Sequence, residues 1–382
     1  MLNEPSILAS GKSETPARTS QATSPRNTVL EQLETAVSGV MDIYQVNDNP
    51  PPPVGASFTG RLRVESEVAY DTVDRQFADL DYHAILTTDE EDRHVIIALK
   101  GRIRPKPRPL WPHLVLLILT LLSMLFVGAS QHTGEVSYEL WLGLPYAISM
   151  ILILGTHELG HYFAARRHGV SVTLPYFIPF PFGLFGTLGA FIQLREPMRN
   201  RKILFDVGAA GPLAGLVVAL PVLLIGLATS EIKPLPTEAY LLEGDSLLYA
   251  GSKFLVFGQF LPNATEDVFI NQLAMAGWTG LFITGLNLIP LGQLDGGHVI
   301  FTLFGRRAQR LYLPILAGFF ALSFYNPSWL FWTLLLFVLG RVYAVPLDTV
   351  TPLDQRRRWL GYLAMAIFVL VFVPNPFHSV QP

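Results

Sequence analysis

Residues 140–165 read LWLGLPYAISMILILGTHELGHYFAA, and this stretch decides how the chain must fold. Most of it is apolar, and its length exceeds the roughly 20 residues that an α-helix needs to cross the hydrocarbon core of a bilayer. Its last third carries two histidines and a glutamate. Ionisable side chains at membrane depth are costly and usually face a buried site instead of lipid. The stretch therefore predicts a membrane helix that turns polar groups toward the inside of a helix bundle.

The composition extends this prediction to the rest of the chain. Of the 382 residues, 50% are hydrophobic and only 15% are charged, whereas soluble domains carry about 25% charged residues. Further apolar stretches that predict membrane helices lie at residues 110–129, 205–228, 269–289, 309–324, 329–346 and 358–373, of which 309–324 and 329–346 are short. We expect a mainly α fold, a polytopic membrane helix bundle of about six or seven spans.

The distribution of lysine and arginine predicts the orientation of this bundle. Placing the N-terminus inside puts 18 lysines and arginines of the connecting segments on that side, and only Lys233 and Lys253 on the other. Positive charge is enriched on the cytoplasmic side of membrane proteins. We therefore expect a multi-pass protein in the lipid bilayer with a cytoplasmic N-terminus. The net charge of −3 argues against nucleic acid as a partner.

The composition changes along the chain and divides it into three predicted segments. Residues 1–55 are rich in Ser, Thr, Pro, Asn and Gln, which predicts a disordered tail. Residues 56–106 predict a small cytosolic α/β domain with βαββ order, with strands at 61–64, 82–86 and 95–99 and an amphipathic helix at 68–80. Residues 107–382 form the predicted transmembrane domain.

The residues HELGH at 157–161 form the strongest chemical motif in the chain. Cysteine is absent, so any metal must be bound by His, Asp or Glu. Residues four apart share one face of a helix, so His157 and His161 can bind one metal ion while Glu158 lies close to a water molecule on it. The alternative is that these groups only snorkel to the membrane surface beside Arg166 and Arg167.

A catalytic metal site of this type needs a third protein ligand. The intramembrane candidates are Asp206, Asp295 and His298. Asp295 lies in the segment NLIPLGQLDGGH, residues 287–298, where proline and glycines interrupt an apolar span. Broken membrane helices are tolerated where they line a cavity. Asp295 and His157 are expected at similar depth. His298 is a rival ligand or a supporting residue, and Asp206 is expected near a helix N-terminus, where the helix dipole favours it.

Two further segments have a predictable architecture. Residues 173–192, TLPYFIPFPFGLFGTLGAFI, contain too much proline for a helix and are too apolar for a solvated loop. We interpret them as a re-entrant apolar hairpin whose free strand edge pairs with an extended peptide; the alternative is a loop packed on the membrane surface. Residues 208–215, GAAGPLAG, offer a small-residue face that lets the third span approach the histidine helix closely.

The motif at 157–161, the segment Gly211–Gly215 and the segment Asn287–His298 occur in an order that resembles the site-2 protease family of intramembrane zinc metalloproteases. Within it, residues 185–191 and 292–296 are most similar to the EGY-like branch of cyanobacteria and plastids. The resemblance covers about residues 60–375. It implies one Zn²⁺ per chain on His157, His161 and Asp295, with Glu158 as the catalytic acid and base and Asn287 near the scissile carbonyl.

The function that this resemblance implies is hydrolysis of peptide bonds in or next to membrane spans, by a zinc-bound water that Glu158 activates. The implied partners are single-span membrane proteins, which such enzymes release from the membrane. A catalytically silent scaffold or transporter of the same fold is the alternative. Another zinc hydrolase, such as a prenyl-protein protease, would not need the segment Asn287–His298. Glutamates at positions 4, 14, 31 and 34 are unusual in a transit peptide, so the sequence favours a bacterial plasma membrane over a plastid membrane.

Overall fold

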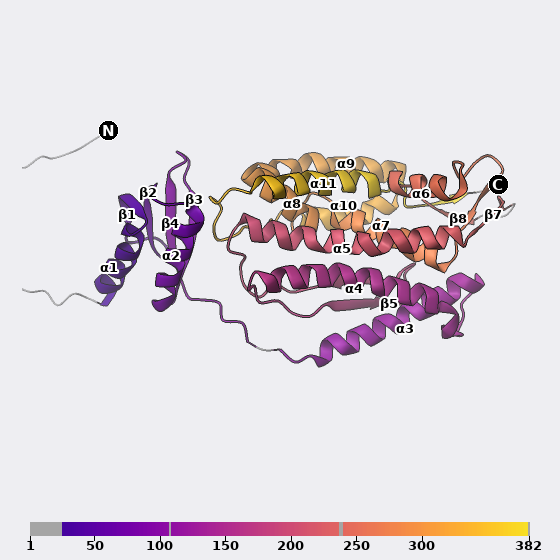
Figure 1. Ribbon diagram of the computed structural model, residues 1–382, viewed down its shortest axis with the longest axis horizontal. Helices are drawn as coiled ribbons and strands as arrows, with labels where there is room; N and C mark the ends of the chain where they lie inside the picture. Colours follow the sequence, from indigo (N-terminus) through magenta and orange to yellow (C-terminus); the bar gives the residue numbers. More distant parts are fainter. Residues whose placement is uncertain (1–24, 107, 237–239, 381–382) are drawn as a thin grey trace, which may run out of the picture.

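The computed structural model describes residues 25–106, 108–236 and 240–380. It is mainly helical, with a small α/β domain at one end and a helix bundle beside it (Figure 1). Three of its helical segments, Trp111–Thr133, Leu140–Arg167 and Arg201–Ala228, are long and apolar enough to cross a membrane. They correspond to the first three predicted spans, so the prediction of a membrane protein is confirmed. The first and third are α3 and α5, and the second comprises the 3₁₀ turn η1 (Leu140–Gly143) and α4 (Leu144–Arg167).

The remaining helices are shorter than a membrane span. They are α6 (Leu247–Phe257), α7 (Gln272–Asn287), α8 (Asp295–Phe304), the 3₁₀ helix η2 (Gly305–Leu311), α9 (Tyr312–Tyr325), α10 (Ser328–Leu339) and α11 (Gln355–Val371). Helices α7, α9, α10 and α11 fall within or close to the four later spans of the sequence analysis, and Figure 1 shows them along the same long axis as α4 and α5. The number of spans stays a prediction.

The N-terminal domain has the order αββαββ. Its elements are α1 (Pro25–Ser38), β1 (Met41–Asn47), β2 (Val54–Leu62), α2 (Ser66–Asp79), β3 (Tyr82–Thr88) and β4 (His94–Lys100). The four strands form an antiparallel sheet in the order β1-β2-β4-β3. Side chains of the sheet and both helices, among them Phe58 and Phe77, share one buried core.

The prediction of a disordered tail over residues 1–55 is wrong from residue 25 onward. Helix α1 and strand β1 bury Leu33, Val37 and Met41 in the core of the N-terminal domain. A few apolar anchors at helical spacing are enough to order a segment whose average composition is polar. The same anchors add an α-helix and a strand to the predicted βαββ order, and β2 starts at Val54 and not at Arg61. The predicted tail residues 1–24 lie outside the described part.

The predicted interruption between residues 287 and 295 is present. Helix α7 ends at Asn287 and α8 begins at Asp295. In the break, Gly292 has a positive φ of 57°, and a side chain on Gly296 would come within 2.0 Å of the Leu288 carbonyl oxygen. Only glycine allows the chain to fold back this tightly. The break therefore presents the first residue of α8 beside the end of α7.

The apolar segment at 173–192 folds as a β-hairpin. Strands β5 (Tyr176–Phe180) and β6 (Gly186–Phe191) pair antiparallel. A side chain on Gly186 would meet the Met124 backbone at 2.8 Å, so the hairpin packs closely on α3. The hairpin of the sequence analysis is thus present, whereas its re-entry into the membrane stays a prediction.

The opposite end of the bundle from the N-terminal domain is closed by short strands (Figure 1). Strand β7 (Glu231–Pro234) pairs with β9 (Glu266–Phe269), and β8 (Tyr240–Glu243) pairs with β10 (Phe377–Val380). Lys253 is almost completely buried there and lies 2.8 Å from Asp245. Glu243 accepts a hydrogen bond of 2.8 Å from the Tyr249 hydroxyl.

Burial raises the pKa of Glu243 from 4.5 to about 7. A carboxyl whose pKa is higher in the fold than in the unfolded chain stabilises the fold below pH 4.5, and this contribution is lost as the pH rises through about 7. We expect Glu243→Gln to lose less stability than the wild type between about pH 5 and pH 8. Thermal unfolding in detergent at both pH values measures the difference. Glu231→Gln, at an exposed site of the same end, should behave like the wild type; identical pH profiles for all three proteins would contradict the prediction.

Candidate metal centre

Helix α4 places His157, Glu158 and His161 inside the bundle. Their side chains are largely shielded, with exposed fractions of 3%, 5% and 6%. A helix that snorkels its polar end to the surface would leave these groups exposed. The structure therefore contradicts the snorkelling alternative and leaves three buried polar side chains that require partners.

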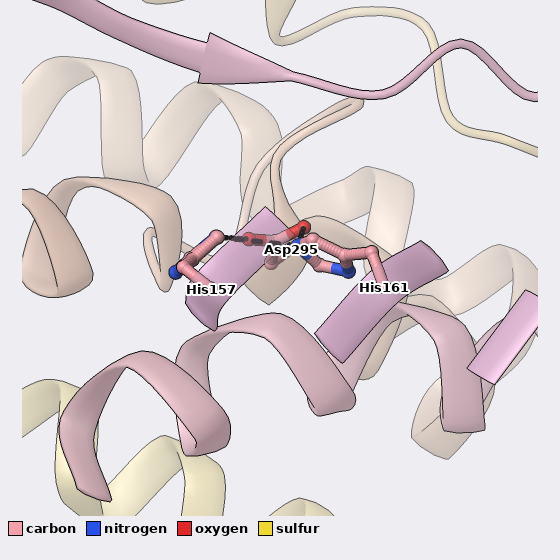
Figure 2. Close-up of side chains that lie close together, drawn as sticks. All are labelled: His157, His161 and Asp295. Carbon is pink, nitrogen blue, oxygen red and sulfur yellow. Dashed lines mark hydrogen bonds and ion pairs between the residues drawn. The ribbon is translucent and has the colours of Figure 1, made fainter. Parts of the chain in front are cut away.

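Asp295, the first residue of α8, meets the two histidines (Figure 2). Its Oδ2 lies 3.3 Å from His157 Nε2, and its Oδ1 lies 3.3 Å from His161 Nε2. The two Nε2 atoms are 3.2 Å apart. Within the described residues this is the only group of three or more metal-ligating side chains whose ligand atoms all lie within 4.8 Å of one another. The break between α7 and α8 thus brings Asp295 next to His157 and His161, which lie 134 positions or more before it in the sequence.

The distances of 3.2–3.3 Å between the two Nε2 atoms, and from each of them to one carboxylate oxygen of Asp295, are close to those around a zinc ion. Ligand atoms bound tetrahedrally at about 2.0–2.2 Å from zinc lie about 3.3–3.6 Å from one another. Two imidazoles and one carboxylate are a ligand set of catalytic zinc sites, which keep the fourth position open. The donor set and its geometry therefore match the zinc site that the sequence analysis expected, and zinc is the metal that the centre suits.

The ring nitrogens of both histidines are oriented by neighbours. His161 Nδ1 lies 2.7 Å from the Val207 carbonyl oxygen of α5, so it donates to that oxygen and leaves Nε2 facing Asp295. Asn287 Nδ2 lies 3.2 Å from His157 Nε2, which places the Asn287 side chain beside the ligand cluster. Backbone contacts of this kind give no signal in the sequence.

The two other candidate ligands lie elsewhere. His298 is outside the cluster, and its Cβ would be 2.7 Å from a side chain on Gly208 of α5, so it packs between α8 and α5. Asp206 lies in the second turn of α5 and receives two hydrogen bonds from Arg357 of α11, at 2.7 and 2.6 Å. It also lies 2.8 Å from His168. This network ties together the ends of α4, α5 and α11.

The small-residue face of α5 has a more specific role than close helix packing. A side chain on Gly211 would come within 2.0 Å of His161 Nε2, and one on Gly215 within 3.1 Å of the His157 Cβ. The two glycines therefore provide the space that the imidazoles occupy. From the sequence we assigned this face to contact between helices alone. The spacing of the glycines indicated that contact, but it did not indicate which side chains occupy the space beside them.

A cavity of about 680 Å³ opens beside the ligands. Its lining comes from His157 and Glu158 of α4, strand β6, the end of α7 and the apolar face of α10. Hydrophobic side chains predominate in it. A polar reaction centre at the end of an apolar cavity can act on a group that is delivered from an apolar environment.

The space beside His161 yields a test of the centre. We expect Gly211→Ala to weaken zinc binding by about 10- to 100-fold, because displacing an oriented ligand has an effect of this size. Metal analysis and competition with a chelator on detergent-purified protein measure it. Gly226→Ala is the matched control, since its side chain would come within 2.1 Å of the Ala274 backbone on α7 and not near the ligands. Wild-type zinc affinity in a folded Gly211→Ala protein would show that the glycine is not required.

Comparison with known proteins agrees with this architecture. Residues 145–319 match the model of peptidase family M50. The chain is 31% identical over 354 residues to a protein of Arabidopsis thaliana named probable zinc metalloprotease EGY2, chloroplastic, covering 88% of this chain and 63% of that relative. It is 30% identical over 308 residues to the Arabidopsis thaliana protein named probable zinc metalloprotease EGY1, chloroplastic, covering 71% and 54%.

The rice protein of the same EGY2 name, from Oryza sativa subsp. indica, is 29% identical over 366 residues, covering 91% of this chain and 66% of the relative. The chain thus spans less than two thirds of the length of these relatives. No solved structure matches the chain. The family match includes α4, α5, α7 and α8, the four helices that build the ligand cluster and its supports. This part of the chain is a peptidase family M50 domain, and the chain as a whole is similar to the EGY zinc metalloproteases.

Proposed function

We propose that this protein is an intramembrane zinc metalloprotease that hydrolyses peptide bonds in or next to the membrane spans of other proteins. The observation that carries the proposal is the meeting of His157, His161 and Asp295 at the end of an apolar cavity that Glu158 also lines. The names of the relatives support a zinc metalloprotease. The site-2 protease resemblance of the sequence supports its action within the membrane.

Each polar residue of the centre has a distinct task in this proposal. His157, His161 and Asp295 hold the zinc ion. When bound, zinc supplies a Lewis acid that acidifies water and polarises a carbonyl group. Glu158 takes a proton from the attacking water and delivers it to the leaving amine, so the amide bond breaks without free charge in an apolar site. Asn287, whose Nδ2 lies beside the ligand cluster, donates a hydrogen bond to the scissile carbonyl oxygen in this proposal.

The cavity favours an extended apolar peptide as substrate. Within the described residues, β6 pairs with β5 on one edge and with no strand on the other. Gly189 of β6 lines the cavity, and open space lies where its side chain would be, so a peptide backbone can approach it closely. A helical span must unwind to expose its amide, and the free edge of β6 offers the backbone partners that unwinding would otherwise leave unsatisfied.

The membrane setting of this reaction also belongs to the proposal. Basic side chains gather near the N-terminal domain, among them Arg166, Arg167, Arg199 and Lys202, which favours the cytosolic or stromal side for that end. The relatives are named chloroplastic. These names favour a plastid membrane, or the membrane of a bacterium whose protein belongs to the same branch. Both are favoured over the plasma membrane of a bacterium outside that branch. We propose six or seven spans, the three long helical segments together with shorter helices of the later part of the chain.

Zinc content tests the centre without knowledge of the substrate. We expect about one zinc per wild-type chain in detergent and clear losses in His157→Ala and in Asp295→Ala, because each removes one of three protein ligands. Metal analysis of purified protein measures both. His298→Ala should keep its zinc, since that residue lies outside the cluster. A folded wild type that takes up no zinc when supplied with it would favour a silent scaffold.

The role of Glu158 is tested by cleavage. We expect Glu158→Gln to lower the rate on a membrane-span substrate by about 100- to 10,000-fold, the usual range for a general acid–base group. Because Glu158 is not a ligand, zinc content should be unchanged. Mass spectrometry of the products in proteoliposomes measures the rate and the bond cut. Unaltered cleavage in this variant would assign the proton transfer to another group.

A further inference from the structure

The N-terminal domain is joined to the helix bundle by an extra strand. Leu86 of β3, the outermost strand of the sheet, donates a backbone hydrogen bond of 2.8 Å to the Leu347 carbonyl and accepts one of 2.9 Å from Thr349 N–H. This is a parallel bridge between Leu86 and Asp348. Figure 1 shows the gold connection that leads into α11 reaching β3. The segment 347–351 thus pairs with the edge of the sheet of a domain about 260 positions earlier in the sequence.

The same segment binds the bundle on its other side. Leu347 N–H and Asp348 N–H donate to the carbonyl oxygens of Met198 and Arg199, at 3.0 and 2.6 Å. A second parallel bridge joins Asp348 to Asn200, the N-cap of α5. The sheet therefore runs from the N-terminal domain through residues 347–349 to the first residue before α5. Backbone hydrogen bonds in this arrangement fix the register of all three segments.

Helix α2 adds a charged contact to this junction. Glu67 lies 2.6 Å from Lys202 Nζ, and Asp71 lies 3.3 Å from Arg199. The Ser66 hydroxyl lies 2.9 Å from the Thr351 hydroxyl. These acidic and basic side chains are partly exposed, with fractions between 27% and 58%. Ion pairs of this exposure are screened by salt and contribute little individually, so this charged part of the contact is easily weakened.

Segment 347–351 holds its own shape. Asp348 is completely buried, and its carboxylate accepts hydrogen bonds from the backbone N–H groups of Val350 and Thr351 at 2.8 and 3.0 Å and from the Thr351 hydroxyl. Leu347 and Val350 pack against the core of the N-terminal domain. The strand is therefore preformed by local bonds and docks as a unit.

The segment leads directly to the cavity wall. It follows α10, whose side chains Phe331, Leu335 and Leu339 line the cavity beside the zinc ligands. The end of α10 also packs on the break that carries Asp295, since a side chain on Gly292 would meet the Leu339 carbonyl at 2.5 Å. Residues 340–346 join α10 to this segment, so holding residues 347–351 restrains the end of a helix that lines the cavity.

We propose that the N-terminal domain is a releasable clasp, which restrains the α10 wall of the cavity by binding segment 347–351 as an additional strand of its sheet. Its docked state holds α10 in place and so limits the width of the cavity, and its release lets α10 move and admits a larger substrate. The consequence for cleavage rests on the proposed protease function. The docking of the N-terminal domain and its restraint of α10 do not depend on the proposed protease function.

A cysteine pair tests the docking, because the chain contains no cysteine of its own. In full-length Ser66→Cys/Thr351→Cys protein, we expect oxidation to form an intramolecular disulfide, which reducing agent reverses and intact mass detects. The matched control is Thr72→Cys/Thr351→Cys, since position 72 lies about 240° around α2 from position 66. Equal crosslinking in the two pairs would overturn the docked arrangement.

A single thiol in the cavity wall tests the restraint without any cleavage assay. Leu336 lines the cavity and is only 3% exposed in the docked protein. In Leu336→Cys protein in detergent, we expect Glu67→Lys combined with Asp71→Lys to raise the rate of alkylation by a maleimide about tenfold, because these changes raise the population of the released state from a few per cent. Adding Lys202→Glu and Arg199→Glu restores the ion pairs with reversed sign and should return the rate to its original value. Glu34→Lys, an exposed change on α1, should leave it unaltered. An unchanged rate in a folded Glu67→Lys/Asp71→Lys protein would overturn the clasp.

The activity arm separates the two proposals. Oxidised Ser66→Cys/Thr351→Cys protein should cleave a membrane-span substrate about tenfold more slowly than the reduced protein, because the open state is removed. Equal rates before and after complete crosslinking would overturn the clasp. If alkylation of Leu336→Cys responds as expected but wild type cleaves nothing, the clasp is supported and the protease assignment fails.

Discussion

The contact between the α4 histidines and Asp295 is the constraint on which the rest of the structure depends. Three polar side chains in an apolar bundle are stable only if they satisfy one another or bind an ion. That requirement forces α8 to start next to the middle of α4, although the chain between them includes the β5–β6 hairpin and the helices α5, α6 and α7. The break after α7, with its glycines, is what allows α8 to approach α4 so closely.

The positions that make room for the ligands and for the cavity are glycines, which have no side chain. Gly211 and Gly215 leave room for the imidazoles, Gly296 lets α8 fold back on α7, and Gly189 leaves open space along the cavity edge. In water such positions weaken a helix or strand by entropy. In a bundle they are tolerated because packing between neighbouring helices holds the backbone in place.

The sequence predicted the parts of this architecture that depend on local spacing. Histidines four apart share a helix face, and proline with glycines interrupts a helix, so the ligand set could be proposed from residues alone. The role of Gly211 and the Val207 carbonyl could not, because both depend on which helix packs against α4. The order within residues 25–55 was missed because a few buried anchors, such as Leu33, stand in a polar segment. The strand at 347–351 was missed because its partner lies far away in sequence.

The part of the chain from α10 to residues 347–351 is held at one end by close backbone packing and at the other by a contact that is more easily weakened. Around the ligands, close backbone approach leaves no clearance, and packed interiors respond to displacement as rigid bodies. At the junction with the N-terminal domain, partly exposed ion pairs and a short strand make a contact that salt or a competing partner can weaken. Helix α10 lies between these two regions. In the proposed function, a rigid metal centre and a cavity that admits a large substrate coexist because the contact proposed to move lies outside the ligand cluster.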